Sequence, residues 1–263
     1  MFSIILPVYN AEETIDETLQ SIKNQDYTDY ELVIINDGSN DNTLELIKKF
    51  IVKHESIDIK LISRSNKGFM FSLEEGIQLS KNRLIARIDS DDVWESNHLS
   101  TMMKCFRSDN GLVLAGSNAK LIDISGKVIG SLKMPQNIEK AMLFDNPLIH
   151  SSVVFDKNAY YKTNGYLRER SDVNDIFADY RLWLEFLSIG KCVNSGMQTL
   201  RYRFLESSMS RKLSKLPYYR GRLKLAYAAY SKIRKYHFYF LFCIAKIVAR
   251  ILQHKLYEII NPR

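Results

Sequence analysis

The sequence predicts an α/β fold with a doubly wound, mostly parallel sheet, and three observations support that prediction. The chain has 263 residues, of which 46% are hydrophobic and 25% charged, as in an ordinary folded globular protein. Short β-branched runs alternate with segments of helical spacing along the first 90 residues. Polar residues follow each of those runs, as expected where parallel strands end together. An α+β arrangement with antiparallel strands is the alternative.

Four runs in the first half have the continuous apolar character of buried parallel strands. They cover residues 4–8, 32–35, 57–62 and 84–88. The segments between them carry apolar side chains at the spacing of helices. These stripes contain Thr14-Ile15, Leu19 and Ile22 in the first segment, Leu44, Ile47, Phe50 and Ile51 in the second, and Phe69, Leu73, Ile77 and Leu79 in the third.

After Asp92 the pattern changes to a smaller, mixed region. We expect a helix over 96–107, strands over 112–115 and 119–124, and a hairpin that returns through 127–129. A strand over 151–155, a helix over 176–188 and a strand over 200–204 follow, and the chain beyond Leu216 is helix-like throughout. These patterns divide the chain into a large domain over 1–215, with halves at 1–95 and 96–215, and a helical segment over 216–263.

Each predicted strand of the first half delivers polar residues to one edge of the sheet. In open parallel sheets, ligands bind beyond the carboxyl ends of the strands. Any one of these groups is also ordinary turn chemistry, but four in register predict a binding site. In strand order the groups are Tyr9-Asn10, Asn36-Asp37-Gly38-Ser39, Arg64-Ser65-Asn66-Lys67-Gly68 and Asp89-Ser90-Asp91-Asp92.

The last of these groups predicts a divalent cation site. Asp89 and Asp91 are two residues apart, so they project to the same side of an extended backbone. Carboxylates that close repel each other unless a cation or a raised pKa relieves them, and oxygen ligands suit Mg²⁺ or Mn²⁺ shared with substrate phosphates. Asp92 is equally explained as the acidic start of the next helix. Lys67, ahead of a helix, would complement the site by attracting phosphate.

These ordered motifs resemble those of the family 2 glycosyltransferases, over residues 2 to about 210. The resemblance implies the GT-A fold and inverting transfer of a sugar from a nucleotide-sugar. Its motifs are Pro7-Val8-Tyr9-Asn10, Asp37-Gly38-Ser39 with Asp41 and Thr43, Asn66-Lys67-Gly68, Asp89-Ser90-Asp91-Asp92 as the D-x-D, Asp179-Tyr180-Arg181-Leu182-Trp183, and Arg201-Tyr202-Arg203 with Ser208-Met209-Ser210.

The resemblance also implies roles for individual residues. It places Mn²⁺ or Mg²⁺ on Asp91, with Asp89 beside the ion or on the ribose. The residues expected to bind the nucleotide-sugar are Pro7, Tyr9, Asn10, Asp37, Ser39, Lys67, Asp89 and Ser90. No donor contact is predicted from the helix after Gly68, because Glu74 or Glu75 stands where many relatives have Asn.

Asp179 is the expected catalytic base, since inverting transfer needs one carboxylate to take the proton of the acceptor hydroxyl. Asp172 and Asp175 are its rivals, because Ala178 stands where relatives often have Glu. An acid at a helix N-terminus is the other interpretation of Asp179. Acceptor-side contacts are expected from His150, Trp183 and Arg203, and a purely structural role explains His150 equally well.

The positive charge of the chain lies in its last fifth. Residues 1–210 hold 24 basic and 29 acidic side chains, whereas 211–263 hold 13 basic and one acidic. On a helix over 244–259, cations and polar residues fall on one side and apolar residues on the other, which predicts contact with an anionic membrane. The two sets are Lys246, Arg250, Gln253 and His254, and Ile244, Ile247, Val248, Ile251, Leu252 and Ile259.

Two other partners compete with the membrane for this segment. Its apolar stripe could dock on the catalytic domain or on a second subunit, as in a homodimer. Nucleic acid is not an expected partner, because the large domain is net acidic and carries no recognisable binding motif.

Together these expectations describe a hexosyltransferase that is cytoplasmic and peripheral on the inner membrane. The resemblance favours UDP-glucose or UDP-galactose as donor, then UDP-N-acetylhexosamine. The acceptor would be an undecaprenyl-diphosphate-linked GlcNAc-type saccharide, in lipopolysaccharide O-antigen or capsule assembly. Three scattered cysteines and the absence of a signal-peptide pattern fit that location.

Two alternatives to a glycosyltransferase remain. One is an inactive nucleotide-sugar-binding or membrane-scaffold protein, which would need none of the carboxylates for chemistry. The other is a sugar nucleotidyltransferase, which would need a glycine-rich phosphate loop where this chain has Pro7-Val8-Tyr9-Asn10.

Overall fold

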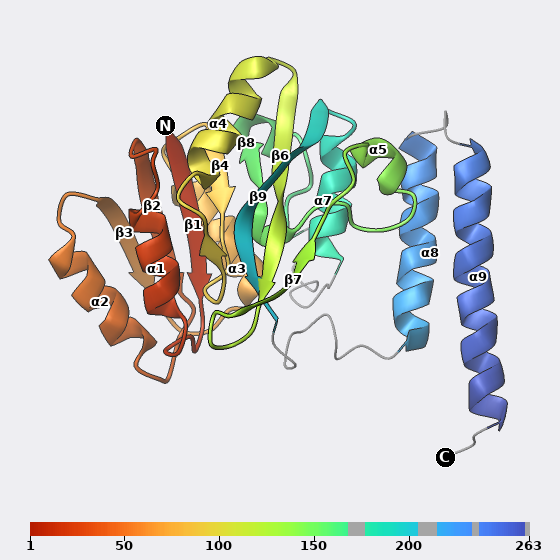
Figure 1. The fold of residues 1–263 in the computed structure, drawn as a ribbon, viewed down its shortest axis with the longest axis horizontal. Coiled ribbons are helices and arrows are strands. Elements are labelled where there is room, and N and C mark those ends of the chain that lie inside the picture. Colours follow the sequence, from red (N-terminus) through yellow and green to blue (C-terminus); the bar gives the residue numbers. More distant parts are fainter. Residues whose placement is uncertain (168–176, 205–214, 233–236, 261–263) are drawn as a thin grey trace.

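A curled sheet runs through the large domain (Figure 1). The computed structural model describes residues 1–167, 177–204, 215–232 and 237–260. Within them the sheet has nine strands in the order β3-β2-β1-β4-β8-β6-β9-β5, with β7 paired to β6. Asp172, Asp175 and Ser208-Met209-Ser210 lie outside the described residues.

The first half is the parallel part of the sheet and confirms the predicted alternation. Its strands are β1 (Phe2–Val8), β2 (Tyr30–Asn36), β3 (Asp58–Ser63) and β4 (Leu84–Arg87), connected by α1 (Ile15–Lys23), α2 (Thr43–Lys53) and α3 (Phe69–Leu79). Successive residues of β1 face opposite layers, as the pleat requires. Ile5 belongs to the cluster that contains α3, whereas Ile4 and Leu6 pack with α1 and α2.

The second half is mixed and holds the remaining elements of the large domain. β8 (Val154–Asp156) joins the halves, because it pairs antiparallel with both β4 and β6. β6 and β9 pair in parallel, and β5 and β7 are antiparallel to β9 and β6. The other bounds are β5 (Val93–Trp94), α4 (His98–Ser108), β6 (Leu112–Ile122), β7 (Val128–Leu132), α5 (Ile138–Ala141), the 3₁₀ turn η1 (His150–Ser152), α6 (Lys157–Tyr160), α7 (Ala178–Phe186) and β9 (Lys191–Arg203).

Several predicted boundaries in this half were wrong. The two strands expected over 112–115 and 119–124 are one strand, because β6 keeps pairing with β9 across register shifts at 116–119. The late strand begins at Lys191 rather than at 200, and polar residues such as Asn194 hid its first part. The strand expected over 151–155 begins only at Val154, after η1. β5, α5 and α6 were not predicted, because two to four residues are too few to show a period.

Two long helices, α8 (Lys215–Lys232) and α9 (His237–Ile260), lie side by side at the edge of the molecule (Figure 1). Leu225 and Ala229 of α8 and Phe240 and Ile247 of α9 are buried in the same apolar cluster as Trp183 of α7. Part of the apolar stripe therefore docks on the large domain, which was one of the predicted alternatives. None of the helices described is long and apolar enough to cross a membrane.

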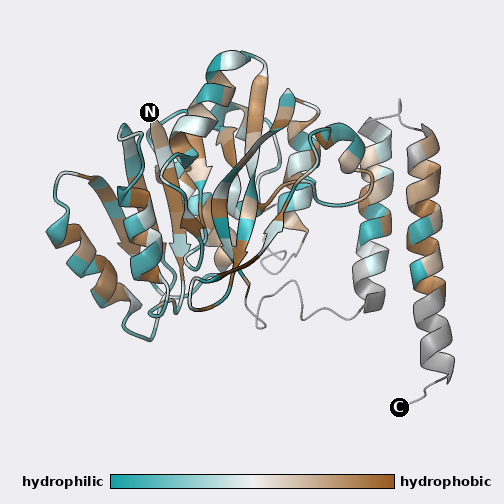
Figure 2. Cartoon of the chain, viewed as in Figure 1, coloured by the Kyte–Doolittle hydropathy of each residue, from teal (hydrophilic) through white to brown (hydrophobic). Residues whose placement is uncertain are grey.

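The predicted stripe of α9 is divided between two environments. Ile247 is buried in the shared apolar cluster, whereas Val248 and Leu252 are exposed. Figure 2 shows hydrophobic residues distributed around the described part of this helix. The side chains at 253–260, which include the predicted polar side at Gln253 and His254, lie outside the described residues.

Candidate functional site

The loops after β1 and β2 are tied together at the carboxyl edge of the sheet. Asn10 has a left-handed backbone (φ 47°) that turns its amide toward Ser39 Oγ, at 3.0 Å. In return the amide of Asn40 donates to Asn10 Oδ1 at 2.9 Å. Tyr9 is 49% exposed beside this link, while Pro7 is buried within β1. Of these residues, Tyr9 has the exposed ring that a nucleobase could contact.

Asp37 is buried, and its carboxylate holds the loop after β3. It accepts hydrogen bonds from the amides of Lys67 at 2.8 Å and Gly68 at 2.9 Å, and it forms an ion pair with Arg64. Gly38 (φ +77°) makes this close approach feasible, since a Cβ there would lie 2.8 Å from the Asn66 nitrogen. Asp37 therefore shapes the loop that presents Lys67, whose exposed ammonium lies 4.7 Å from the centre of the Phe71 ring.

Asp89, Asp91 and Asp92 form a carboxylate triplet directly after β4. One oxygen from each lies within 4.8 Å of the others, so the structure brings Asp89 and Asp91 together as predicted and adds Asp92. Burial and the charge of Asp89 raise the pKa of Asp91 to about 6, and burial also raises the pKa of Asp92. Oδ2 of Asp92 is buried with no hydrogen-bond partner among the described residues. This oxygen-only cluster fits Mg²⁺ or Mn²⁺, which would relieve the repulsion.

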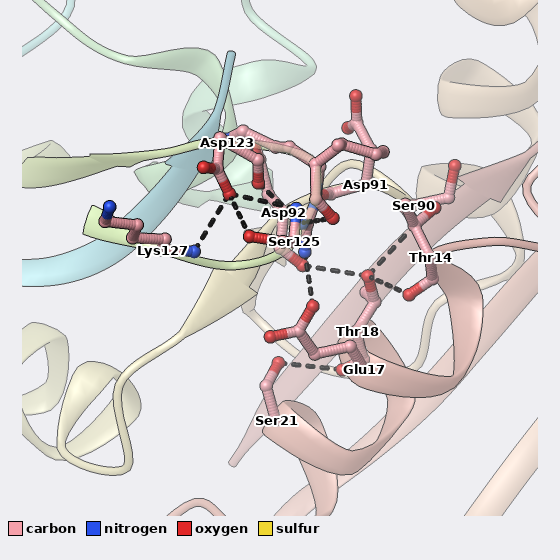
Figure 3. Close-up of polar contacts among 12 residues, drawn as sticks. Thr14, Glu17, Thr18, Ser21, Ser90, Asp91, Asp92, Asp123, Ser125 and Lys127 are labelled. Carbon is pink, nitrogen blue, oxygen red and sulfur yellow. Dashed lines mark hydrogen bonds and ion pairs between the residues drawn. The ribbon is translucent and has the colours of Figure 1, made fainter. Parts of the chain in front are cut away.

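Hydroxyl groups of α1 and of Thr14, which directly precedes this helix, support the triplet (Figure 3). Thr14 Oγ1 lies 2.8 Å from the Ser90 carbonyl oxygen, and Thr18 Oγ1 lies 3.0 Å from the same oxygen and 2.8 Å from that of Asp92. Hydroxyls that donate to carbonyls fix the backbone of the loop. The two threonines therefore hold the loop without using the carboxylates of Asp89 and Asp91.

Arg203, expected on the acceptor side, is buried beneath the triplet. Its amide donates to Asp92 Oδ1 and its Nε–H to the Asp91 carbonyl, both at 2.8 Å. Its Nη1 donates to the carbonyls of Asp123 and Ile124 at 2.9 Å, and its Nη2 pairs with Glu17 of α1. These contacts occupy the guanidinium, so in this structure Arg203 clamps α1, the triplet and the turn after β6.

Arg87, the last residue of β4, is a second buried cation beside the triplet. Only 1% of it is exposed, and its Nη2 pairs with Asp89. Its Nε and Nη1 have no hydrogen-bond partner among the described residues. The positive charge of Arg87 lowers the pKa of both Asp91 and Asp179, so it acts on both groups of acids.

Asp179 lies in the first turn of α7 and is partly buried. Its Oδ2 accepts a hydrogen bond from Asn146 Nδ2 at 2.7 Å. Burial raises the pKa of this carboxyl to about 6, and the amide of Tyr180 and Asn146 limit the rise. A carboxylate with that pKa is ionised at neutral pH and more basic than a solvated one, as a general base requires.

The other two acceptor-side candidates are inside the protein. Trp183 of α7 is fully buried in the apolar core, with its ring centre 5.8 Å from that of His150. His150 is partly buried, and its Nε2 lies 2.8 Å from the Tyr166 hydroxyl. Burial and the charge of Arg87 lower the pKa of His150 well below its usual value, which keeps the imidazole neutral. Both residues pack beside the site rather than opening onto it.

Five residues of the site were missed by the sequence analysis. Thr14, Thr18 and Ser21, whose Oγ accepts a hydrogen bond from the Trp94 amide of β5 at 3.2 Å, recur at the spacing of one helical face. This polar stripe beside the apolar one was visible in the sequence. Arg87 also had a visible pattern, because it ends a strand two residues before Asp89 and so shares its side. Asn146 lies in an irregular loop that carries no periodic pattern.

Comparison with known proteins agrees with this geometry. Residues 3–164 match the family model described as glycosyl transferase family 2. The chain is 31% identical over 229 residues to the O-antigen biosynthesis glycosyltransferase WbnJ of Escherichia coli, across 83% of this chain and 85% of WbnJ. It is 29% identical over 214 residues to WfgD of Escherichia coli, a UDP-Glc:alpha-D-GlcNAc-diphosphoundecaprenol beta-1,3-glucosyltransferase, across 80% of this chain and 79% of WfgD.

A solved structure supports the fold. The mannosyltransferase PcManGT of Pyrobaculum calidifontis, in complex with GDP-Man and Mn²⁺, superposes with a TM-score of 0.65 at 15% identity over 89% of this chain. This chain spans 64% of that one, and 65% of an uncharacterized glycosyltransferase from Haemophilus influenzae. The predicted GT-A fold is confirmed, and the chain belongs to glycosyl transferase family 2.

Proposed function

We propose that this protein is an inverting glycosyltransferase that moves a hexosyl group from a UDP-sugar to a lipid-linked saccharide. The observation that carries the proposal is the pairing of an oxygen-only acidic cluster with a separate carboxylate of raised pKa. Asp91 and Asp179 both lie in the electrostatic field of Arg87. A cation site and a base that act on one substrate suit the transfer of a group from a diphosphate to a hydroxyl.

The donor would lie across the carboxyl edge of the parallel half. The Tyr9 ring and the loop fixed by Asp37 would hold the nucleoside, and Lys67 would face the phosphates. Asp91 and Asp89 would hold Mn²⁺ or Mg²⁺, which when bound neutralises the charge that develops on the leaving diphosphate. Thr18 and Arg203 would keep the loop in place.

Asp179 would act on the acceptor. The acceptor oxygen attacks the anomeric carbon from the face opposite the diphosphate, and the carbon–oxygen bond to the diphosphate breaks as the new bond forms. The hydroxyl proton passes to the Asp179 carboxylate. One displacement without a covalent intermediate inverts the anomeric configuration.

The donor and acceptor class rest on the relatives. WfgD, at 29% identity, uses UDP-Glc and a diphosphoundecaprenol-linked GlcNAc according to its name, and WbnJ serves O-antigen biosynthesis. We therefore favour UDP-glucose, with UDP-galactose next, and a lipid-diphosphate GlcNAc acceptor.

A panel of UDP-sugars tests this proposal. The protein is incubated with Mn²⁺, undecaprenyl-diphosphate-linked GlcNAc and each donor, and both UDP release and the lengthened lipid product are measured. We expect one hexose donor to give both products, and Asp91→Asn to abolish them while the fold by circular dichroism is unchanged. Donor binding without transfer for every pair would instead support the scaffold alternative. Release of pyrophosphate in a separate incubation with UTP and a hexose 1-phosphate would support a nucleotidyltransferase.

The same proposal includes a membrane surface as partner of α9. Phe238, Leu241, Phe242 and Leu252 are exposed apolar side chains on this helix, and Lys246 lies 4.4 Å from the centre of the Phe242 ring. An apolar face with flanking cations is typical of a helix that lies in an anionic lipid interface.

Liposome sedimentation tests the membrane contact. We expect Leu241→Glu to reduce the bound fraction on phosphatidylglycerol vesicles about tenfold, through lost burial and added repulsion. Val52→Glu is the matched control, because Val52 is an exposed apolar residue on α2 in the acidic half. Equal binding of the two variants would contradict a membrane role for α9.

A further inference from the structure

The segment of residues 142–146, here called the bridge segment, lies between α7 and the C-terminal helices. On the α7 side, the Tyr180 hydroxyl donates to the Met142 carbonyl, and Asn146 donates to Asp179 Oδ2 at 2.7 Å. These two contacts hold both ends of the segment to the first turn of α7. The bridge segment thus supplies a hydrogen bond to the candidate base.

The opposite side of the bridge segment is held by α8 and α9. Arg222 of α8 forms an ion pair with Asp145, which directly precedes Asn146. Cys243 of α9 donates through its thiol to the Leu143 carbonyl, and the Phe242 ring lies edge-on to Phe144 with centres 6.5 Å apart. Three consecutive residues of the segment therefore contact the helical pair.

The helical pair also touches α7 itself. The Arg222 guanidinium carbon lies 5.6 Å from the centre of the Tyr180 ring, next to Asp179 in the chain. Gly221 packs so closely on Phe177 that a Cβ would lie 2.4 Å from its ring. Arg222 and Tyr180 are both buried, so their contact is shielded from solvent, whereas Asp145 at the other end of the ion pair is exposed. The bridge segment and the residues at the start of α7 therefore both contact α8.

We propose that α8 and α9 position the candidate base, with Arg222 as the positioning residue that acts on Asp179 through the bridge segment. This inference rests on the proposed role of Asp179. It gives the helices a part in the reaction besides any contact with a membrane. When Arg222 is lost, Asp145 and the Tyr180 ring lose their shared partner, and Asn146 is no longer fixed against Asp179.

The other groups around Asp179 determine which kinetic constants the loss of Arg222 should change. The charged or titratable groups that act on it are Arg87 and Asp89 from the end of β4 and Tyr166 from the loop after α6. None of these contacts α8 through a described interaction. Loss of Arg222 should therefore change the base and leave the donor half intact.

Arg222→Met in the full-length protein tests the inference, with Lys224→Met as matched control because Lys224 is exposed on the same helix. We expect Arg222→Met to lower kcat at least tenfold while the KM for the donor and the Kd for UDP with Mn²⁺ change less than twofold. The acidic limb of the pH–kcat profile should move to higher pH, since Asp179 loses the hydrogen bond that stabilises its charge. Amide exchange over 178–186 should accelerate, with β1 and β2 unaffected. Lys224→Met should behave as the wild type.

Further variants keep the test decisive if Arg222→Met folds poorly. Asp145→Asn removes the ion pair from its exposed end, and we expect the same kinetic pattern in weaker form, with partial recovery in Arg222→Lys. Wild-type kcat and pH profile in both Arg222→Met and Asp145→Asn would overturn the inference. So would equal losses in UDP binding and kcat, which indicate general destabilisation. If the wild type transfers no sugar but Arg222→Met still speeds exchange in α7, the proposed function fails and not the positioning contact.

Discussion

The parallel half and the C-terminal helices stabilise their polar groups in opposite ways. In the parallel half, neighbouring loops bind one another through their backbones, as Asp37 binds the amides of Lys67 and Gly68. The C-terminal helices instead pack on the rest of the protein through apolar side chains and make their polar contacts through side chains such as Arg222 and Cys243. One region is a preformed, acidic binding edge. The other is a basic, docked support whose outer face is still apolar.

This difference assigns separate tasks to the two regions. The edge of the parallel half collects carboxylates that suit a cation and a nucleotide. The excess positive charge of the chain lies in the sequence over 211–263, the part that contains α8 and α9. A variant in the first region should therefore impair donor or cation binding, and a variant in the second should impair the base. Three predictions test this division, in order of expected effect.

The largest effect is expected at the base itself. Asp179→Asn should lower kcat about 10²- to 10⁴-fold, the usual contribution of a positioned base, with donor binding unchanged. In the wild type, kcat should fall as the pH drops through about 6, because Asp179 with its raised pKa becomes protonated there. Initial rates from pH 5 to 8 measure both. A wild-type profile that is flat across pH 6 would exclude Asp179 as the base.

The raised pKa of Asp179 also predicts how Asp179→Asn changes the free energy of unfolding at different pH values. The pKa of Asp179 is higher in the folded than in the unfolded protein, so its ionisation costs stability as the pH rises through 6. Asp179→Asn should therefore be more stable than the wild type at pH 8, by on the order of 1–2 kcal/mol, and lose that advantage near pH 4. Urea unfolding at the two pH values measures it.

The second effect is expected in the cradle of the triplet. Thr18→Val keeps the shape of the side chain but leaves the buried carbonyls of Ser90 and Asp92 without its hydroxyl. Removal of that donor should cost about 1–3 kcal/mol of unfolding free energy and weaken Mn²⁺ binding several-fold. Titration calorimetry with Mn²⁺ and UDP measures the affinity. Thr18→Ser should restore it, and Thr101→Val on α4 serves as control; unchanged Mn²⁺ affinity in Thr18→Val would contradict a positioning role.

The smallest effect comes from a matched pair of helical glycines. In Gly76→Ala the new methyl would lie 2.5 Å from Ile5 Cγ2, and in Gly221→Ala 2.4 Å from the Phe177 ring. Overpacking by each new methyl should lower the free energy of unfolding by about 1–3 kcal/mol. About 1 kcal/mol of that loss should be regained, because Ala favours a helix more than Gly does. Gly76→Ala should raise the KM for the donor, and Gly221→Ala should lower kcat. The same kinetic defect in both variants would mean that the two regions are not separate.

Much of the fold was predictable because it depends on local patterns. The strands of the parallel half contain uninterrupted apolar runs, and the helices between them have a regular apolar period, so both were located to within a few residues. The second half was less predictable. The start of β9 is polar because it pairs with β6 on one side only over that stretch, and β5 is too short to show any period.

The candidate site was likewise predictable only in part. The sequence by itself determined which carboxylates follow β4 and which polar loops share one edge, because parallel strands end together whatever their detailed packing. Only the tertiary structure placed Arg203 beneath Asp92, 111 residues away in the chain, and linked Arg222 to Asp179 through Asp145 and Asn146. A periodic pattern shows which face of a helix or strand is buried. It does not report the partner of a buried charge, since that partner is chosen by the packing of distant segments.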